Sequence, residues 1–190
     1  LVLCDTGALK SRPHDFLVDG MGEVVKYGMI KSDELFGILM NHDINTVHEV
    51  MDDIIARCVA IKRDVVEADE FDKGERMLLN FGHTLGHSIE QYYHYTGISH
   101  GRAVAKGMEI ITDLAEKRGM CRKGLTAELC GCLKKYELTR DIEPTPAQLG
   151  SACMNDKKRD GSSIHVIICS DIGKSSAVKM SVADFNDFLA

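Results

Sequence analysis

The sequence predicts a mainly α-helical domain with a small β element near its C-terminus. Along most of its 190 residues, apolar side chains recur at spacings of three and four, as they do on amphipathic helices. Only residues 164–180 carry the β-branched pattern between turn residues that is typical of strands. Strands do not alternate with helices, so we expect no dinucleotide-binding sheet. GMG at 20–22 begins like GxGxxG, but Val25 stands where the last glycine belongs.

Four helices are expected before the proline-rich segment: residues 20–41, 47–65, 102–118 and 127–136. The second has the clearest pattern, because apolar residues from Val50 to Val65 fall on one face. Asn45 or Thr46 is its expected N-cap. Gly119 stands where a glycine commonly ends a helix, directly after the third of these stretches.

The C-terminal part of the chain supplies the β element. The segment DIEPTPAQLG holds two of the three prolines and predicts a loop followed by a new helix. Residues 164–169 form a β-branched run between Gly161 and Gly173, which predicts a strand with residues 177–180 as its partner. Residues 181–189 predict a closing helix.

The composition fits one globular domain over residues 1–190, with 44% apolar and 27% charged residues. The net charge of -6 argues against a nucleic-acid partner, which would need a basic face. Seven cysteines without a CxxC pair are expected to be small buried side chains in a reducing compartment. Because the sequence shows neither an apolar run of membrane length nor a leader pattern, we expect a cytoplasmic protein without a membrane partner.

Three histidines and one glutamate form the candidate metal site. His83 and His87 lie four residues apart and share one face of a helix, while His100 follows a turn-like stretch. Glu23 lies far upstream, in DGMGEVVKYG. Two imidazoles from different helices and a distant carboxylate are the usual composition of an open, catalytic zinc site. HTLGH lacks the glutamate of HExxH, which argues against a metalloprotease.

A polar stripe passes through the two neighbouring histidines if the helix extends upstream: Arg76, Asn80, His83, His87, Glu90 and His94. A solvated helix face is the commoner origin of such a stripe. However, asparagine and histidine are poor helix formers, and Gly82 and Gly86 weaken the helix further. Glycines at such positions indicate the close approach of another backbone or of a ligand. We therefore favour a functional face.

Two lysines each have two interpretations. Lys62 interrupts the apolar face of residues 47–65, either as a snorkelling side chain or as a cation directed into a cleft toward phosphate or carboxylate. Lys26 stands three residues after Glu23. That spacing fits an ordinary ion pair, and equally a carboxylate on a metal beside a lysine on the substrate.

Four segments resemble the 3-dehydroquinate synthases, in order and across nearly the whole chain: GMGEVVKYGMI, LLNFGHTLGHSIE, HGRAVAKGM and NDKKRDGSSIHVIICSDIGK. The resemblance is to the C-terminal, metal- and substrate-binding domain of that family, a multi-helix domain of the dehydroquinate synthase-like type. Residues 1–13 resemble the strand and loop that leave the family's N-terminal NAD-binding domain, which we expect to be absent from these 190 residues.

The resemblance implies roles for individual residues. Glu23, His83 and His100 would bind the metal, normally Zn²⁺ and alternatively Co²⁺. His87, Lys26 and Arg76 would act in catalysis. The remaining predicted residues would bind the substrate: Lys62, Asn80, Asp72, Lys157 and Lys158.

The implied reaction converts 3-deoxy-D-arabino-heptulosonate 7-phosphate to 3-dehydroquinate and phosphate, using NAD bound mainly by the other domain. The isolated chain would be inactive, and the full-length enzyme a homodimer. Two departures from the family pattern stand out: Asp72 replaces a usual glutamate, and Arg102 replaces the usual acid after His100 and Gly101. Alternatives are a different sugar-phosphate cyclase, a metal-dependent polyol dehydrogenase of the glycerol dehydrogenase type, and a non-catalytic relic.

Overall fold

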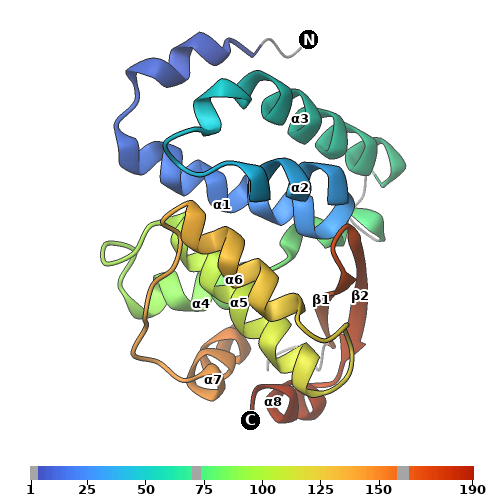
Figure 1. Ribbon diagram of the computed structural model, residues 1–190. Helices are drawn as coiled ribbons and strands as arrows, with labels where there is room; N and C mark the ends of the chain where they lie inside the picture. The colour runs from blue at the N-terminus through green and yellow to red at the C-terminus, as the bar shows by residue number, and fades with distance from the viewer. Residues whose placement is uncertain (1–3, 70–73, 158–162) are drawn as a thin grey trace.

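The computed structural model describes residues 4–69, 74–157 and 163–190, and most of these residues are helical (Figure 1). The α-helices are α1 (His14–Lys31), α2 (Asp33–Asn41), α3 (Met51–Ala68), α4 (His83–Tyr92), α5 (His100–Lys117), α6 (Leu125–Lys135), α7 (Pro146–Lys157) and α8 (Val182–Leu189). The strands are β1 (Ile164–Asp171) and β2 (Lys174–Met180). Three 3-10 helices precede α1, α3 and α4: η1 (Thr6–Ser11), η2 (Val47–Glu49) and η3 (Glu75–Asn80). The predicted fold class, mainly helical with a small β element, is confirmed.

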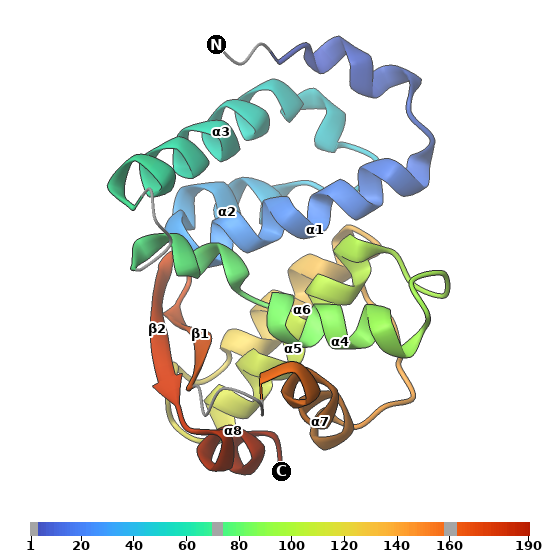
Figure 2. The ribbon, with the colours of Figure 1, turned by 180° about the vertical axis from the view of Figure 1, so that it is seen from behind.

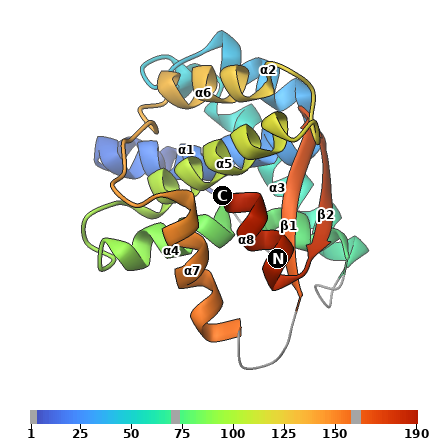
Figure 3. The ribbon, with the colours of Figure 1, turned by 90° about the horizontal axis from the view of Figure 1, so that it is seen from below.

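Helix α5 is the centre of the packing. It contacts α1, α4, α6 and β1, and Figure 3 shows it crossing the middle of the molecule. Helix α3 lies on the side of α1 and α2 that faces away from α5, as Figures 1 and 2 show. Helices α7 and α8 pack against each other at the end that holds the C-terminus. The buried face of α5 is apolar, with Val104 and Met108 fully enclosed.

The first predicted helix, over residues 20–41, is wrong in two respects. Helix α1 begins earlier, at His14, and a break at Ser32 separates it from α2. Ser32 has an extended backbone, and its side chain accepts a hydrogen bond from the Leu35 backbone N–H at 3.1 Å. Serine at the N-cap satisfies one of the amide groups that a helix start leaves without a partner, so the sequence stabilises a new helix here.

The cap predicted for the second helix is also wrong. A 3-10 turn, η2, intervenes, and α3 begins at Met51 without a side-chain hydrogen bond at its N-cap. The side chain of Asp43 instead accepts from the backbone N–H groups of Asn45 and Thr46, at 2.9 and 3.0 Å. Asparagine and threonine thus belong to a turn organised by the preceding aspartate.

The remaining predicted elements are confirmed. Gly119 has a φ of 67° directly after α5, the conformation that favours glycine at a helix end. Pro146 is the first residue of α7, where its missing N–H has no cost. The strands pair antiparallel, from Ile164 opposite Met180 to Asp171 opposite Lys174. Ser181 and Asp184 cap α8 reciprocally.

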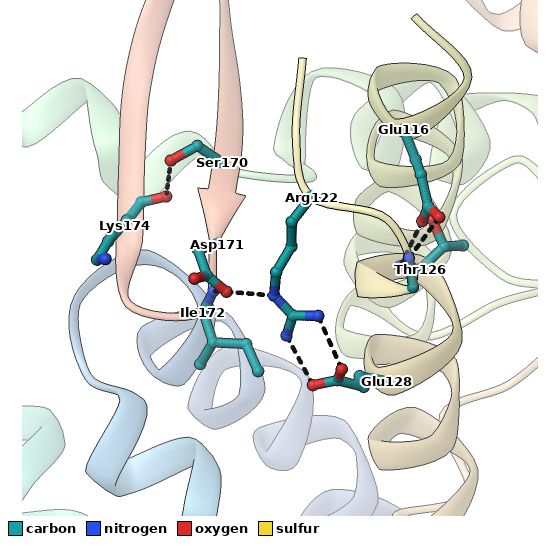
Figure 4. A network of polar contacts seen from close by, with 9 residues as sticks. Glu116, Arg122, Thr126, Glu128, Ser170, Asp171, Ile172 and Lys174 are labelled. Carbon is teal, nitrogen blue, oxygen red and sulfur yellow. Dashed lines mark hydrogen bonds and ion pairs between the residues drawn. The ribbon is translucent and has the colours of Figure 1, made fainter. Parts of the chain in front are cut away.

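Arg122 joins the β-hairpin to the α5–α6 connection (Figure 4). Its guanidinium donates to both carboxylate oxygens of Glu128 at 2.8 Å and also to Asp171 at the end of β1. Nearby, Glu116 at the end of α5 accepts from the backbone N–H groups of Gly124 and Thr126 at the start of α6. The two-bond fork ties Arg122 to α6, and the single charge-assisted bond to Asp171 ties the end of β1 to the same connection.

Two further predictions concern the cysteines and membrane-spanning helices. Cys132 and Cys169 are buried as expected, whereas Cys4 is exposed and the other four cysteines are half-buried. Within the described ranges, no helix has the length and apolar character needed to cross a membrane.

Candidate metal centre and substrate pocket

Three side chains from three helices meet at one point, as predicted. Glu23 lies in the middle of α1, His83 is the first residue of α4, and His100 is the first residue of α5. The Nε2 atoms of His83 and His100 lie 3.2 and 3.6 Å from Glu23 Oε1. One donor atom from each residue lies within 4.8 Å of the other two. This separation lets all three reach a single cation.

Glycines create this convergence by letting helix backbones touch. A Cβ on Gly107 would lie 2.1 Å from the carbonyl oxygen of Gly82, and a Cβ on Gly101 would lie 2.0 Å from that of Asp19. Gly82 also has a φ of 77°, which turns the chain from η3 into α4. The close approach predicted from the α4 glycines is therefore to another backbone, that of α5. The two contacts bring the start of α5 against both α1 and α4, beside Glu23.

Each metal-site imidazole is oriented through its second nitrogen. His83 Nδ1 lies 3.1 Å from the carbonyl oxygen of Phe81, and His100 Nδ1 lies 3.2 Å from Glu90 Oε1. Carbonyl and carboxylate oxygens only accept, so Nδ1 carries the hydrogen in both rings. In the neutral rings the Nε2 lone pairs then face Glu23 Oε1, which is the orientation that joint binding of one cation requires.

The carboxylate of Glu23 is well suited to a cation. Its Oε1 is buried without an aligned hydrogen bond from any described residue, while Oε2 accepts from Lys26 Nζ at 2.5 Å. Burial opposes ionisation, but the His83 contact and the Lys26 ammonium outweigh it and lower the pKa of Glu23 to about 2. A permanently ionised oxygen and two imidazole nitrogens form a donor set that zinc commonly takes in catalytic sites.

His87 stands beside this group, as its spacing predicts. Its ring centroid lies 5.7 Å from that of His83 and 6.1 Å from that of His100. Partial burial and then the neighbouring His83 lower the pKa of His87. A neutral imidazole there is available to accept a proton near neutral pH.

Two adjoining cavities open at the candidate metal site. The smaller, of about 310 Å³, is lined by Tyr27, Leu79 and six residues predicted for the site: Glu23, Lys26, Lys62, Arg76, Asn80 and His83. The larger, of about 570 Å³, is bordered by Asn80, His83, His87 and residues of α4, α7 and β1. Because Asn80 and His83 border both, the cavities meet beside the metal site.

The lining of the smaller cavity bears on the two interpretations given for each lysine. Lys62 lines the cavity, so it is directed into a cleft and does not merely cover apolar surface. Lys26 forms the expected ion pair with Glu23 and also lines the cavity, and its contact with a substrate stays a prediction. Burial lowers the pKa of Lys26 and Glu23 raises it in part.

The predicted single helical stripe is wrong at both ends. Helix α4 starts only at His83, whereas Arg76 and Asn80 belong to η3. Gly82 turns the chain between η3 and α4. His94 lies beyond α4 with a φ of 54°. Asp72 and Lys158 lie outside the described residues. Lys157 ends α7, but its side chain is also outside the described part.

Sequence reasoning missed several residues at this site. Glu90 was placed on the stripe without a role, although it contacts His100. Tyr27 borders the smaller cavity, and Cys153 and His165 reach the larger one from α7 and β1. The motif EVVKYG already contains Tyr27, whereas no spacing in the sequence links Cys153 or His165 to α4.

Arg102 does not lie in the metal site, although it is close to His100 in sequence. Its guanidinium lies 3.5 Å from Asp15 and donates to the carbonyl oxygen of Glu137 at 3.3 Å. Neither Asp15 nor Glu137 belongs to the candidate metal site or lines its two cavities. The positive charge of Arg102, which replaces the family's usual acid, therefore lies near the start of α1.

Comparison with known proteins agrees with this geometry. A sequence profile of the 3-dehydroquinate synthase C-terminal domain matches residues 20–159. The chain belongs to the 3-dehydroquinate synthase family. A 3-dehydroquinate synthase of Clostridium perfringens (strain 13 / Type A) is 44% identical over 187 residues, which cover 97% of this chain and 53% of that protein. A 3-dehydroquinate synthase of Streptococcus thermophilus (strain CNRZ 1066) is 40% identical, and this chain covers 54% of its length. The chain thus spans about half the length of its 3-dehydroquinate synthase relatives.

Solved structures show the same fold. The 2-epi-5-epi-valiolone synthase from Streptomyces hygroscopicus subsp. jinggangensis, with NAD⁺ and Zn²⁺ bound, superposes with a TM-score of 0.83 at 24% identity, covering 97% of this chain and 53% of that one. A 2-deoxy-scyllo-inosose synthase complexed with carbaglucose-6-phosphate, NAD⁺ and Co²⁺ gives 0.79 at 22% identity, covering 97% and 54%. The dehydroquinate synthase-like fold predicted from the sequence is confirmed.

Proposed function

We propose that this chain is the C-terminal, metal- and substrate-binding half of a 3-dehydroquinate synthase. The full enzyme would convert 3-deoxy-D-arabino-heptulosonate 7-phosphate to 3-dehydroquinate and phosphate, a step toward chorismate. The observation that carries this proposal is the meeting of Glu23, His83 and His100 beside a cavity that is also lined by three cationic side chains.

The cation site and the cavity match the needs of such a reaction. A bound Zn²⁺ or Co²⁺ would polarise a substrate oxygen, and NAD, held mainly by the other half of the enzyme, would supply the hydride acceptor. Glu23, His83 and His100 would hold the metal. The fit rests on the buried Oε1 of Glu23 and the two Nε2 atoms that face it.

The chain's own cations would bind the anionic substrate. Lys26, Lys62 and Arg76 line one cavity wall, and Asn80 adds an amide. Guanidinium and ammonium groups bind phosphate and carboxylate through charge-assisted hydrogen bonds. We expect them to orient the substrate and to stabilise the phosphate that leaves. Lys157, Lys158 and Asp72 remain proposed substrate contacts.

His87 would move the proton. It borders the larger cavity one helical turn after His83, and its lowered pKa keeps it neutral and basic near pH 7. The transient ketone of the family reaction acidifies a neighbouring C–H bond, so a base at this position would assist phosphate elimination. We further propose that the full-length enzyme is a cytoplasmic homodimer.

The test compares the chain alone with a fusion to the amino-terminal half of the Clostridium perfringens relative. With Zn²⁺, NAD and the heptulosonate phosphate, the fusion should release phosphate and the chain alone should not. Lys62→Ala in the fusion should raise the KM for this dianionic substrate. Phosphate release by the isolated chain would contradict the need for the NAD-binding half. A fusion that reduces NAD with glycerol and releases no phosphate would favour a polyol dehydrogenase instead.

A further inference from the structure

We infer that Glu90 is a positioning residue of the metal site: it holds His100 in the orientation and tautomer that bind the cation, and it adds a negative charge beside it. This inference rests on the metal centre of the proposed function. Glu90 lies on α4, on the same face as His83 and His87, and its side chain is only 13% exposed.

The contact determines which nitrogen of His100 carries the hydrogen. Glu90 Oε1 lies 3.2 Å from Nδ1 of His100, and the ring's other nitrogen, Nε2, lies 3.6 Å from Glu23 Oε1. Because a carboxylate accepts from Nδ1–H, the lone pair of Nε2 is directed toward Glu23. Without Glu90 the ring could rotate or take the other tautomer, and either change would remove a ligand from the site.

The charges around the site give Glu90 a second effect. Lys26 is bonded to Glu23 and offsets the charge of the only predicted anionic ligand. Glu90 restores a negative charge next to the cation, on the side of His100 away from Glu23. His83 is different, because its Nδ1 faces the neutral carbonyl oxygen of Phe81. The two ligand histidines therefore differ in how much their partners strengthen metal binding.

The same atoms allow a competing role for Glu90. One donor atom each from His87, Glu90 and His100 also lies within 4.8 Å of the others, so this trio could hold a second cation. The hydrogen bond favours positioning, because it uses Glu90 Oε1 and His100 Nδ1 for each other. The two roles differ in stoichiometry. Positioning predicts one cation per chain, and a second site predicts two.

Titration calorimetry of the metal-stripped 190-residue chain with ZnCl₂ distinguishes these roles. We expect one site in the wild type, an affinity about 10- to 100-fold lower in Glu90→Ala, and a smaller loss in Glu90→Gln, which keeps an acceptor but not the charge. Glu109→Ala is the matched control, because Glu109 lies on α5 and pairs with Lys106 away from the site. The visible spectrum of bound Co²⁺ should change in both Glu90 variants and stay unchanged in the control. Circular dichroism verifies the fold of each variant.

Three results would overturn the inference. Zinc binding by Glu90→Ala with wild-type affinity would show that His100 needs no orienting partner. A stoichiometry that falls from two to one in Glu90→Ala would make Glu90 a ligand of a second cation. If the folded wild type binds no zinc at all, the proposed metal centre fails together with this inference, whereas the first two results leave the centre intact.

Discussion

Gly107→Ala tests whether glycine contacts between α4 and α5 set the geometry of the metal site. The added Cβ would lie 2.1 Å from the Gly82 carbonyl oxygen and 3.1 Å from the Gly86 backbone nitrogen. Real Cβ atoms essentially never approach another atom within 3.0 Å, so this contact must lengthen by about 0.9 Å. Backbone atoms cannot rotate away, so one helix must move. Gly82 directly precedes His83, and the movement would separate His83 from His100.

The expected change in the free energy of unfolding follows from two opposed effects. Alanine in a helix interior is favoured over glycine by roughly 1 kcal/mol, while overpacking costs about 1–3 kcal/mol and occasionally more. Gly131→Ala isolates the first effect, because Gly131 lies inside α6 with nothing within 4 Å of its added Cβ. We expect Gly131→Ala to be stabilised by about 1 kcal/mol and Gly107→Ala to be about 3 kcal/mol less stable than Gly131→Ala.

Urea unfolding gives the two free energies, and zinc titration of the same samples gives the effect on the site. Metal-ligand distances must be met within about 0.2 Å, so Gly107→Ala should bind zinc more weakly even where it is fully folded. Gly131→Ala should bind zinc as the wild type does. Equal stability of the two variants, with equal zinc affinity, would refute the view that this contact positions His83.

Three further predictions concern single side chains. His83→Ala should lower zinc affinity by more than the roughly 100-fold that loss of an orienting partner costs, with helix content retained by circular dichroism. Arg102→Ala should cost only about 0–1 kcal/mol in unfolding experiments, since its contact with the exposed Asp15 is a surface pair, and should leave zinc affinity unchanged. The hydroxyl and then the backbone N–H of Ser181 hold the pKa of Asp184 below its ordinary value, so this carboxylate stabilises the fold above about pH 4 and loses that effect as the pH falls. The stability difference between wild type and Asp184→Asn should therefore be smaller at pH 3 than at pH 7.

Each of these predictions has an outcome that contradicts it. Unchanged zinc affinity in a folded His83→Ala protein would remove this residue from the site. A tenfold stronger zinc affinity in Arg102→Ala would mean that its positive charge reaches the cation and repels it. A stability difference for Asp184→Asn that is the same at both pH values would show that ionisation of this group does not contribute to the cap of α8.

The sequence predicted those parts of the fold that depend on local pattern. Helix α3 carries apolar residues at spacings of three and four, and β1 is rich in β-branched residues, so each could be located without the rest of the protein. The break at Ser32 was missed, although Ser32 followed by Asp33 and Glu34 is a local signal for the start of a new helix. The turn at Gly82 was missed because its cause is the backbone of α5, which no local pattern contains.

The candidate site also has parts that the sequence predicted and parts that it did not. The convergence of Glu23, His83 and His100 was predicted from the histidine spacing together with the family resemblance, although HxxxH alone is weak evidence for a metal. The role of Glu90 depends on a contact between the end of α4 and the start of α5, which appears only when the two helices pack. Arg102 shows the converse: it neighbours His100 in the sequence, yet its side chain contacts Asp15 and Glu137.

X-ray absorption at the zinc edge, on the chain loaded with one equivalent of Zn²⁺, tests the central claim most directly. Convergence of Glu23, His83 and His100 on one cation predicts only nitrogen and oxygen neighbours at about 2.0–2.2 Å, with the multiple-scattering pattern of two imidazoles. His83→Ala should remove one imidazole from that pattern. A sulfur neighbour at about 2.3 Å would place the zinc on cysteine and contradict the proposed site.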